Sequence, residues 1–249
     1  MNFQARKLKI ISMLEKEELL DVKILAKKLD ISEITIRRDL NILAKDGLII
    51  RTHGGAMIPK LAHLPVSFTQ KAAKNSYNKD VICRKAASLI KEGDVIFLDC
   101  GSTVFRICPL IKNLKIKVLT NSLPILNELL NSEVSINFIG GEIDFERQAA
   151  HGKIAVEHIN RYRATKAFVG IDGISVKNGL SASSEKEAET CLAINENSNE
   201  TYFLGDSTKI GMDRYFSFAP INMVKNLITD NTIDVATKLC LEQVGIKVW

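Results

Sequence analysis

Apolar residues recur at helical spacing in three successive segments near the start of the chain. One segment covers 4–16, the next runs from Val22 to Leu29, and the third begins after Ser32. The second segment repeats at i, i+3, i+4 and i+7 and the third at i, i+4 and i+7, and the first also turns apolar residues inward, which predicts three short helices around a shared core. The residues that form these faces are Ile10, Ile11 and Leu14; Val22, Leu25, Ala26 and Leu29; and Ile36, Leu40 and Leu43.

Capping residues mark where the second and third segments begin. Asp21 and Ser32 each precede an apolar stripe, and their side-chain oxygens can accept a hydrogen bond from a free amide at the start of a helix. Only residues 30–31 separate the two stripes, which is the spacing of a helix-turn-helix. Gly47, after Asp46, is expected to end the third helix. Residues 48–56 then predict a small β-ribbon, or wing.

The outward face of the third helix suits a groove of DNA. At about 100° per residue, Ile34, Arg38, Asn41 and Lys45 fall opposite the apolar stripe. Arginine can bind guanine or phosphate, and an exposed isoleucine can contact the methyl group of thymine. Because charged helix faces are more commonly only solvated, this pattern alone leaves both interpretations open.

From residue 76 the pattern changes to short apolar runs that alternate with amphipathic segments. This alternation predicts a mostly parallel sheet covered by helices on both faces. The expected strands are 95–98, 116–119, 135–139, 167–171, 201–204, 226–229 and 245–249, and the expected helices are 78–91, 103–112, 122–131, 153–160, 184–197 and 234–243.

Polar residues and glycines follow five consecutive strands of this predicted sheet. Ligands of open α/β sheets bind outside the carboxyl ends of the strands. The turn at 101–103 can offer amides and hydroxyls to a phosphate, with Lys209 as counter-charge, while carboxylates and amides suit sugar hydroxyls. Each residue alone is a common turn residue, but together they predict a small anionic ligand. The set is Asp99, Gly101, Ser102, Thr103, Thr120, Asn121, Ser122, Gly140, Gly141, Asp172, Gly173, Asp206 and Lys209.

The fold class expected is therefore α/β, with a small winged helix-turn-helix domain before a larger sensor-like domain. The first domain should cover 1–58 and the second 76–249. Between them, 59–75 contains Pro59 and Pro65 and has little periodicity, which indicates a linker.

Composition adds a weak argument for a polyanionic partner. The 249 residues are 46% hydrophobic and 25% charged, which is typical of a globular protein, and the net charge is +5. Residues 1–58 hold eleven Lys or Arg and eight Asp or Glu, a net charge of +3 in under a quarter of the chain. This asymmetry favours a nucleic acid as partner of the N-terminal part.

The sequence does not indicate a disulfide-rich, metal-binding or membrane-spanning protein. The five cysteines form no C-x-x-C pair and the four histidines have no ligand spacing, so we expect buried reduced thiols, no metal site and no cofactor. No stretch approaches the eighteen apolar residues that a membrane span needs. We therefore expect a cytoplasmic protein.

The string I-S-E-I-T-I-R-R-D-L at 31–40, followed by G-L-I-I-R-T-H-G-G-A at 47–56, closely resembles the DeoR-type family of bacterial transcription regulators. The resemblance covers about fifty unbroken residues and implies contacts with operator DNA from the third helix and the wing. The residues expected to make these contacts are Ser32, Glu33, Ile34, Thr35, Arg37, Arg38, Asn41, Arg51 and His53.

The second half resembles the DeoR-type sensor domain, which is itself similar to ribose-phosphate isomerase. The matching strings are D-C-G-S-T at 99–103, T-N-S at 120–122, G-G at 140–141, G-I-D-G-I at 170–174 and G-D-S-T-K-I-G at 205–211. The resemblance implies a phosphorylated sugar or a related metabolite as effector. Gly205 and Thr208 stand where the family more often has Ala and Ser.

An isomerase and a purely architectural DNA-binding protein are the alternatives. An isomerase needs a carboxylate base, for which Glu185, Glu187 and Glu189 are the nearest candidates, but Glu185 and Glu189 are more simply a solvated face or, for Glu185, an effector contact. An architectural protein would leave the polar strand ends unexplained. We therefore expect a repressor of a sugar-metabolism operon, without enzymatic activity. One winged domain contacts too little DNA for operator affinity, so we also expect a homo-oligomer, a dimer or higher.

Overall fold

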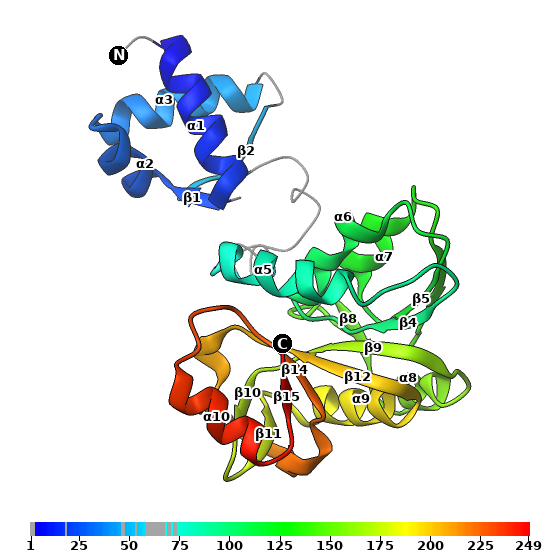
Figure 1. Ribbon diagram of the computed structural model, residues 1–249. Coiled ribbons are helices and arrows are strands. Elements are labelled where there is room, and N and C mark those ends of the chain that lie inside the picture. The colour runs from blue at the N-terminus through cyan, green and yellow to red at the C-terminus, as the bar shows by residue number, and fades with distance from the viewer. Residues whose placement is uncertain are drawn as a thin grey trace. The chain divides into compact units, whose positions relative to one another are not determined.

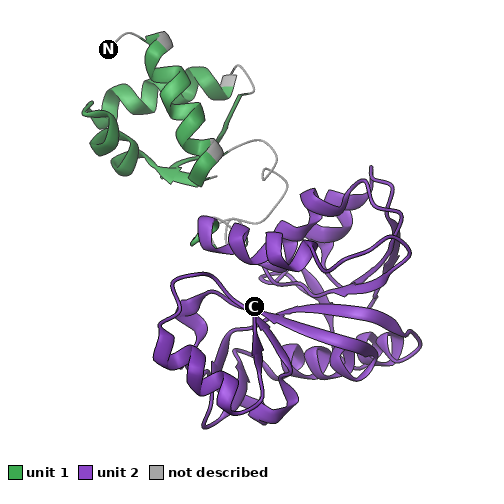
Figure 2. Cartoon of the chain, viewed as in Figure 1, with its two compact units in different colours: residues 1–76 green, residues 77–249 purple. Residues whose placement is uncertain are grey.

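The computed structural model describes residues 3–17, 19–45, 48–52, 54–57, 68, 71 and 74–249. The chain divides into two compact units, residues 1–76 and 77–249 (Figure 2). Most of the expected linker at 59–75 lies outside the described residues, as do the expected helix end at 46–47 and His53.

The first unit contains the three expected helices, α1 (Phe3–Glu17), α2 (Val22–Leu29) and α3 (Glu33–Lys45). Both expected N-caps are confirmed. The carboxylate of Asp21 accepts a hydrogen bond from the amide of Lys23 at 2.7 Å, and Ser32 Oγ accepts one from the amide of Thr35 at 3.3 Å. These caps satisfy amides that have no partner within their own helix.

The core of this unit is built from the predicted apolar stripes. The fully buried side chains are Ile10 and Leu14 of α1, Val22 and Leu25 of α2, and Ile36, Leu40 and Leu43 of α3. One buried charge joins them: the carboxylate of Asp39 accepts hydrogen bonds from Arg6 Nε at 2.5 Å and Nη2 at 3.0 Å. This bidentate pair connects α1 to α3, and the hydrogen bond to Asp39 raises the pKa of Arg6.

The wing has one strand more than the sequence predicted. The strands β2 (Ile50–Arg51) and β3 (Gly55–Met57) form the expected ribbon, and β1 (Leu19–Asp21) pairs with the other side of β3. A Cβ atom at Gly55 would lie 1.9 Å from the carbonyl oxygen of Leu20, so only glycine allows this approach. The sequence did not reveal β1 because three residues carry too little alternation.

The second unit contains a seven-stranded sheet in the order β15-β14-β12-β9-β4-β5-β6, with every neighbouring pair parallel (Figure 1). This confirms the predicted α/β class. The strands are β4 (Val95–Leu98), β5 (Lys117–Thr120), β6 (Ser135–Phe138), β9 (Ala164–Gly170), β12 (Ser198–Leu204), β14 (Asn226–Ile228) and β15 (Lys247–Val248).

Helices cover both faces of this sheet, as expected. Figure 1 shows α5 (Ser76–Ala87), α6 (Cys108–Ile111) and α7 (Leu123–Leu129) along one side, with α8 (Lys153–Ile159) and α9 (Glu185–Glu196) along the other, while α10 (Val235–Gln243) connects β14 to β15. The expected helix at 103–112 is a 3-10 turn, η2 (Val104–Ile107), followed by α6. Pro109 in the first turn of α6 has no N–H and cannot continue a helix that begins earlier. None of the described helices is long and apolar enough to cross a membrane.

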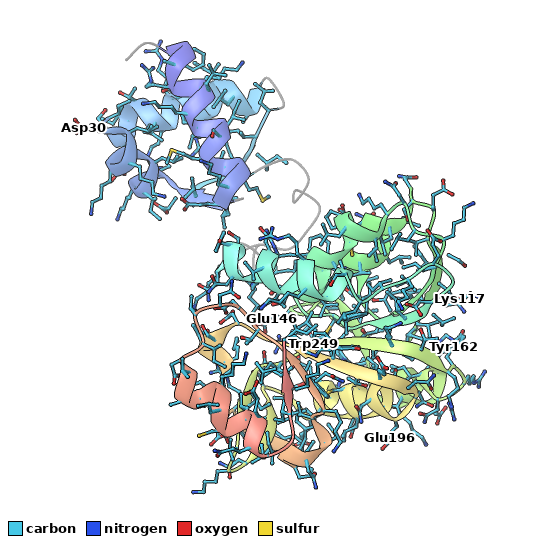
Figure 3. The ribbon with its side chains drawn as sticks, viewed as in Figure 1. Asp30, Lys117, Glu146, Tyr162, Glu196 and Trp249 are labelled. Atoms are coloured by element: carbon cyan, nitrogen blue, oxygen red, sulfur yellow. The ribbon has the colours of Figure 1, made fainter. Side chains whose placement is uncertain are left out.

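Aromatic side chains fill the centre of the sheet. Phe97, Phe168 and Phe203 come from the neighbouring strands β4, β9 and β12 and are fully buried. Trp249, labelled in Figure 3, follows β15 and meets the ring of Tyr202 edge-on, with centroids 5.9 Å apart. This contact secures the short final strand that the sequence predicted at 245–249.

Two small antiparallel sheets were not predicted. One is the hairpin of β7 (Glu142–Asp144) and β8 (Ala149–His151), which follows β6. The other joins β10 (Gly173–Ser175), β11 (Gly179–Ala182) and β13 (Phe216–Ala219) and follows β9. Because both start where a parallel strand ends, they lie at the carboxyl edge of the main sheet.

A pair of substitutions in α3 tests the division between its buried and exposed faces. Leu40→Ala should lower the free energy of unfolding by about 2–5 kcal/mol, because it removes buried methyl groups and leaves a cavity. Ile34→Ala on the exposed face should change it by no more than about 0.5 kcal/mol. Urea titration followed by circular dichroism measures both, and equal losses would contradict the assignment of the two faces.

Candidate nucleic-acid interface and ligand site

The face of α3 opposite the core is exposed. Ile34 has 81% of its surface accessible, and Arg38 and Asn41 are also exposed. Arg37 is exposed and forms an ion pair with Glu33 at 3.4 Å. An exposed pair of this kind contributes little to stability, so Arg37 can exchange Glu33 for a phosphate at low cost.

The start of α3 is held by its own hydroxyl groups. Ser32 Oγ and Thr35 Oγ1 lie 2.9 Å apart, and Ser32 also caps the helix. Both residues therefore have a local structural role, and any DNA contact must use the bonding capacity that remains to these hydroxyls.

Arg51 lies on the wing but contacts α3. Its Nη1 donates to the carbonyl oxygen of Arg37 at 3.2 Å and to Asn41 Oδ1 at 2.7 Å, and its Nε donates to the carbonyl oxygen of Gly55 at 3.2 Å. The sequence suggested that Arg51 holds the DNA backbone, whereas the structure shows that much of its guanidinium joins the wing to α3.

The ligand-site candidates lie where the order of the main sheet reverses. The chain runs from β4 outward to β5 and β6 and then returns to β9, on the other side of β4. The carboxylate of Asp99, after β4, accepts a hydrogen bond from the amide of Gly170 at 3.2 Å. A Cβ atom at Gly101 would lie 3.3 Å from Gly170 Cα, so the two chain segments are in close contact. Such a switch point is where open α/β sheets bind ligands.

Lys79 of α5 is a buried cation at this point, and the sequence analysis missed it. It is 6% exposed, and its Nζ donates to Ser102 Oγ at 3.2 Å. One turn later the thiol of Cys83 donates to the carbonyl oxygen of Thr103 at 3.0 Å, which fixes α5 to the same turn. The signal was present, because Lys79 occupies the first position of the stripe that continues with Ile82, Cys83 and Ala86.

Burial lowers the pKa of Lys79 to about 8. The positive charges of Arg106 and Lys209 add to this effect, while Asp206 opposes it. Charged side chains of η2 and of the loop after β12 thus act on the Lys79 ammonium, which itself contacts Ser102.

Two buried carboxylates hold the loop after β12 by hydrogen bonds to its backbone amides. The buried carboxylate of Asp206 accepts from the amide of Thr208 at 3.1 Å, and the buried carboxylate of Asp230 accepts from the amide of Ser207 at 2.7 Å. These bonds position η3 (Ser207–Lys209), which carries the half-buried Lys209.

The residues after β5 are mostly engaged in structure. The Thr120 hydroxyl donates to the carbonyl oxygen of Leu98 at 2.7 Å, and Ser122 caps α7. Asn121 is 1% exposed; its Nδ2 donates to the carbonyl oxygen of Ala150 at 2.9 Å, but its Oδ1 is buried and has no partner in the described part of the chain. A buried acceptor of this kind suits a ligand hydroxyl.

The glycines after β6 and β9 permit close packing. A Cβ atom at Gly141 would lie 2.6 Å from the carbonyl oxygen of His151, and one at Gly173 would lie 2.5 Å from that of Met212. The amide of Gly140 donates to His158 Nδ1 at 3.3 Å. At the neighbouring Gly205, a Cβ atom would meet the side chain of Ile171 at 2.5 Å.

A second charged cluster lies beside β9, and Arg147 from the hairpin is its centre. Arg147 Nη2 donates to Asp172 Oδ2 at 3.0 Å and to Glu187 Oε2 at 2.8 Å, and Ser183 also donates to Asp172, at 2.8 Å. Burial acts to raise the pKa of Asp172, but Arg147 and Ser183 outweigh it and lower this pKa. Glu187, and not the exposed Glu185, is the α9 carboxylate that joins the cluster.

His151 and Cys100 lie buried near the site, and burial favours their neutral forms. His151 is buried, with Nδ1 3.0 Å from Thr190 Oγ1 and Nε2 3.9 Å from Cys100 Sγ. Burial lowers the pKa of His151 and raises that of Cys100 well above its usual value. Four cysteines are buried, as expected, but Cys240 is exposed. In the described ranges, no group of three or more His, Cys, Asp or Glu side chains could hold a metal ion.

Family models match both halves of the chain. The DeoR-like helix-turn-helix domain matches residues 6–61, and the DeoR C-terminal sensor domain matches residues 74–231. The chain belongs to the DeoR family. The resemblance inferred from the sequence is therefore confirmed.

Similar curated proteins are regulators. The lactose phosphotransferase system repressor of Lactococcus lactis subsp. lactis is 36% identical over 94% of this chain and 93% of its own length. The uncharacterized HTH-type transcriptional regulator YulB and the HTH-type transcriptional repressor GlcR, both of Bacillus subtilis, are 31% and 28% identical, each over 98% of this chain and 95% of theirs. This DeoR-family chain is a DNA-binding transcription regulator and not an enzyme.

Solved structures give only weak similarities. Ribose 5-phosphate isomerase A from Methanocaldococcus jannaschii is 19% identical over 55% of each chain, with a TM-score of 0.40. RipA from Yersinia pestis is 13% identical over 67% of this chain and 47% of its own, with a TM-score of 0.45. Similarity at this level carries no argument about function.

Replacing Arg147 tests the second charged cluster. Arg147→Met should lower the free energy of unfolding by about 1–3 kcal/mol at pH 7, because it leaves two partly buried carboxylates without their cation. The pKa of Asp172 is lower in the folded protein than in the unfolded chain. Its carboxylate therefore stabilises the fold above the unfolded-state pKa, and this stabilisation is lost as the pH falls through the folded-state pKa. The difference between the wild type and the variant should therefore shrink below about pH 4.

Lys186→Met is the matched control, because Lys186 pairs with Glu142 on the surface and the change should cost under about 1 kcal/mol. Urea titrations at several pH values measure both variants. A loss for Arg147→Met that stays constant at acid pH would contradict this assignment.

Proposed function

We propose that the chain represses a sugar-metabolism operon and that a phosphorylated sugar, bound at the carboxyl edge of the main sheet, controls its affinity for DNA. The observation that carries the proposal is the hydrogen bond from Lys79 to Ser102, at the point where the strand order of the main sheet reverses. It places a cation beside the Gly101-Ser102-Thr103 turn, where backbone amides and hydroxyls can bind a phosphate. The name of the L. lactis relative, a repressor of a sugar phosphotransferase system, agrees with this class of ligand.

On the DNA side, α3 enters the major groove. Arg37 and Arg38 bind phosphate or guanine, Ile34 contacts a thymine methyl group, and Ser32, Glu33, Thr35 and Asn41 complete the contact surface. On the wing, His53 is the candidate for a contact with the DNA backbone, while Arg51 holds the wing against α3 through its hydrogen bonds to Arg37 and Asn41. The exposure of Ile34 supports this role, because an isolated apolar side chain on a cationic helix face has no use in the unit's own core.

On the ligand side, the phosphate lies at the Gly101-Ser102-Thr103 turn between Lys79 and Lys209. The hydroxyls of the sugar bind polar atoms around this position, of which Asn121 Oδ1 is the acceptor that lacks a partner in the described structure. The remaining candidates form the rim of the site or shape its backbone; they are Asp99, Thr120, Ser122, Gly140, Gly141, Asp172, Gly173, Glu185 and Asp206.

The repressor acts as a homo-oligomer. A helix-turn-helix protein reads two half-sites with two copies of its recognition helix, and a single module buries too little surface for specific affinity. The larger second unit is where we place the interface between copies.

A thermal-shift screen of sugar phosphates and their unphosphorylated parents tests the ligand. A phosphate at about 100 times its Kd should raise the free energy of unfolding by about 2.7 kcal/mol, whereas the parent sugar should not. Lys79→Met should abolish the shift, because it removes the buried cation. Lys117→Met is the control, since Lys117 lies at the amino end of β5 (Figure 3) and is exposed.

The thermal shift caused by the sugar phosphate should depend on pH. The ammonium of Lys79 is lost as pH rises past its pKa of about 8, so the phosphate-induced shift should decrease above that value. The proposal fails if no sugar phosphate stabilises the protein, or if Lys79→Met and Lys117→Met respond to the hit alike.

A further inference from the structure

A hydrogen bond from Arg51 fixes the orientation of the Asn41 side-chain amide. Arg51 Nη1 lies 2.7 Å from the end of the Asn41 side chain. A guanidinium has only donors, so the amide atom at this distance must be the acceptor Oδ1. The orientation of the amide therefore follows from chemistry, although the oxygen and nitrogen of an asparagine are otherwise hard to tell apart.

The guanidinium itself is fixed by its other hydrogen bonds. The same Nη1 donates to the carbonyl oxygen of Arg37, one helical turn before Asn41, and Nε donates to the carbonyl oxygen of Gly55 on β3. Because Nη1 contacts the helix backbone, Asn41 Oδ1 points back towards α3 and the wing. The exposed side chain of Asn41 thus offers the donors of Nδ2 to a partner.

We propose that Arg51 is a positioning residue that makes Asn41 a donor-only contact in the operator complex. An asparagine that recognises adenine does so in a bidentate manner, with Oδ1 accepting from N6 and Nδ2 donating to N7. With Oδ1 turned to Arg51, Asn41 can only donate, which favours bases that offer acceptors alone: guanine, with N7 and O6, and thymine, with O4. Adenine is disfavoured, because it keeps only N7 as an acceptor and its N6 donor is left without a partner. This inference rests on the proposed role of α3 as the helix that reads the groove.

In vitro selection from a random duplex library, with the full-length wild-type protein and with Asn41→Ala, tests the base preference. Asn41→Ala should relax one position per half-site, and the wild type should select guanine or thymine there. Adenine at that position would overturn the inference while leaving the proposed function intact. Failure of the wild type to select any sequence would overturn both.

A double-mutant cycle on the selected duplex tests the role of Arg51. Introduced alone, Arg51→Met should weaken DNA binding on the order of tenfold. Introduced into the Asn41→Ala variant, it should have little further effect, because both changes disturb the same contact of Asn41 with a base. The dependence of log K on log salt should keep its slope, whereas loss of a phosphate contact would reduce the slope by about 0.9. Arg51→Lys, which still donates to Oδ1, should restore part of the affinity.

Circular dichroism melts check that each variant is folded, and the base-preference test on the wild type does not depend on the Arg51 variants. Additive effects of Arg51→Met and Asn41→Ala, or a reduced salt slope, would show that Arg51 contacts DNA independently and would overturn its role as a positioning residue.

Discussion

The reversal of strand order between β4 and β9 is the constraint on which the second unit depends. Parallel strands place all their carboxyl ends at one edge, and only at the reversal do the connecting segments leave in opposite directions. Gly101 and Gly170 let the two strand ends approach closely, and the hydrogen bond from the Gly170 amide to Asp99 holds them together.

Charge is distributed unequally around that junction. On the α5 side, the cations include Lys79, Arg106 and Lys209, of which Arg106 pairs with Asp80 while Asp206 acts on Lys79. On the β9 side, the cation Arg147 pairs with both Asp172 and Glu187. The proposed ligand follows this division, with its phosphate on the α5 side and its neutral hydroxyl groups on the β9 side. A phosphorylated sugar has both chemical features, which is the physical basis of the proposed ligand.

Much of the architecture followed from periodicity. The faces of α1, α2 and α3 and the strands of the main sheet were predictable because burial repeats every 3.6 or 2 residues. The strands β1, β7 and β10 were missed because three residues carry no period. Lys79 was visible as a lysine in an apolar stripe, but helical periodicity does not show which turn of another segment a buried side chain faces.

Contacts between side chains that are far apart in the chain could not be predicted from the sequence. Arg147 lies 40 residues from Glu187, and nothing local in either segment indicates that they meet. Likewise, the sequence placed Arg51 on the wing but gave no direction for its side chain. Its hydrogen bond to Asn41 depends on how the wing packs on α3, a property of tertiary structure. The strand-end glycines were identified, yet at Gly141 and Gly173 the structure explains them by packing.

Control of the operon by a ligand requires that binding at the strand-end site changes the affinity of the recognition helix for DNA. The most direct test is a fluorescence-anisotropy titration of the selected duplex with full-length protein, with and without the stabilising sugar phosphate. The Kd for DNA should change about 5–150-fold, and the affinity for the sugar phosphate should change by the same factor when DNA is bound. A sugar phosphate that stabilises the protein but leaves its Kd for DNA unchanged would contradict ligand control of DNA binding.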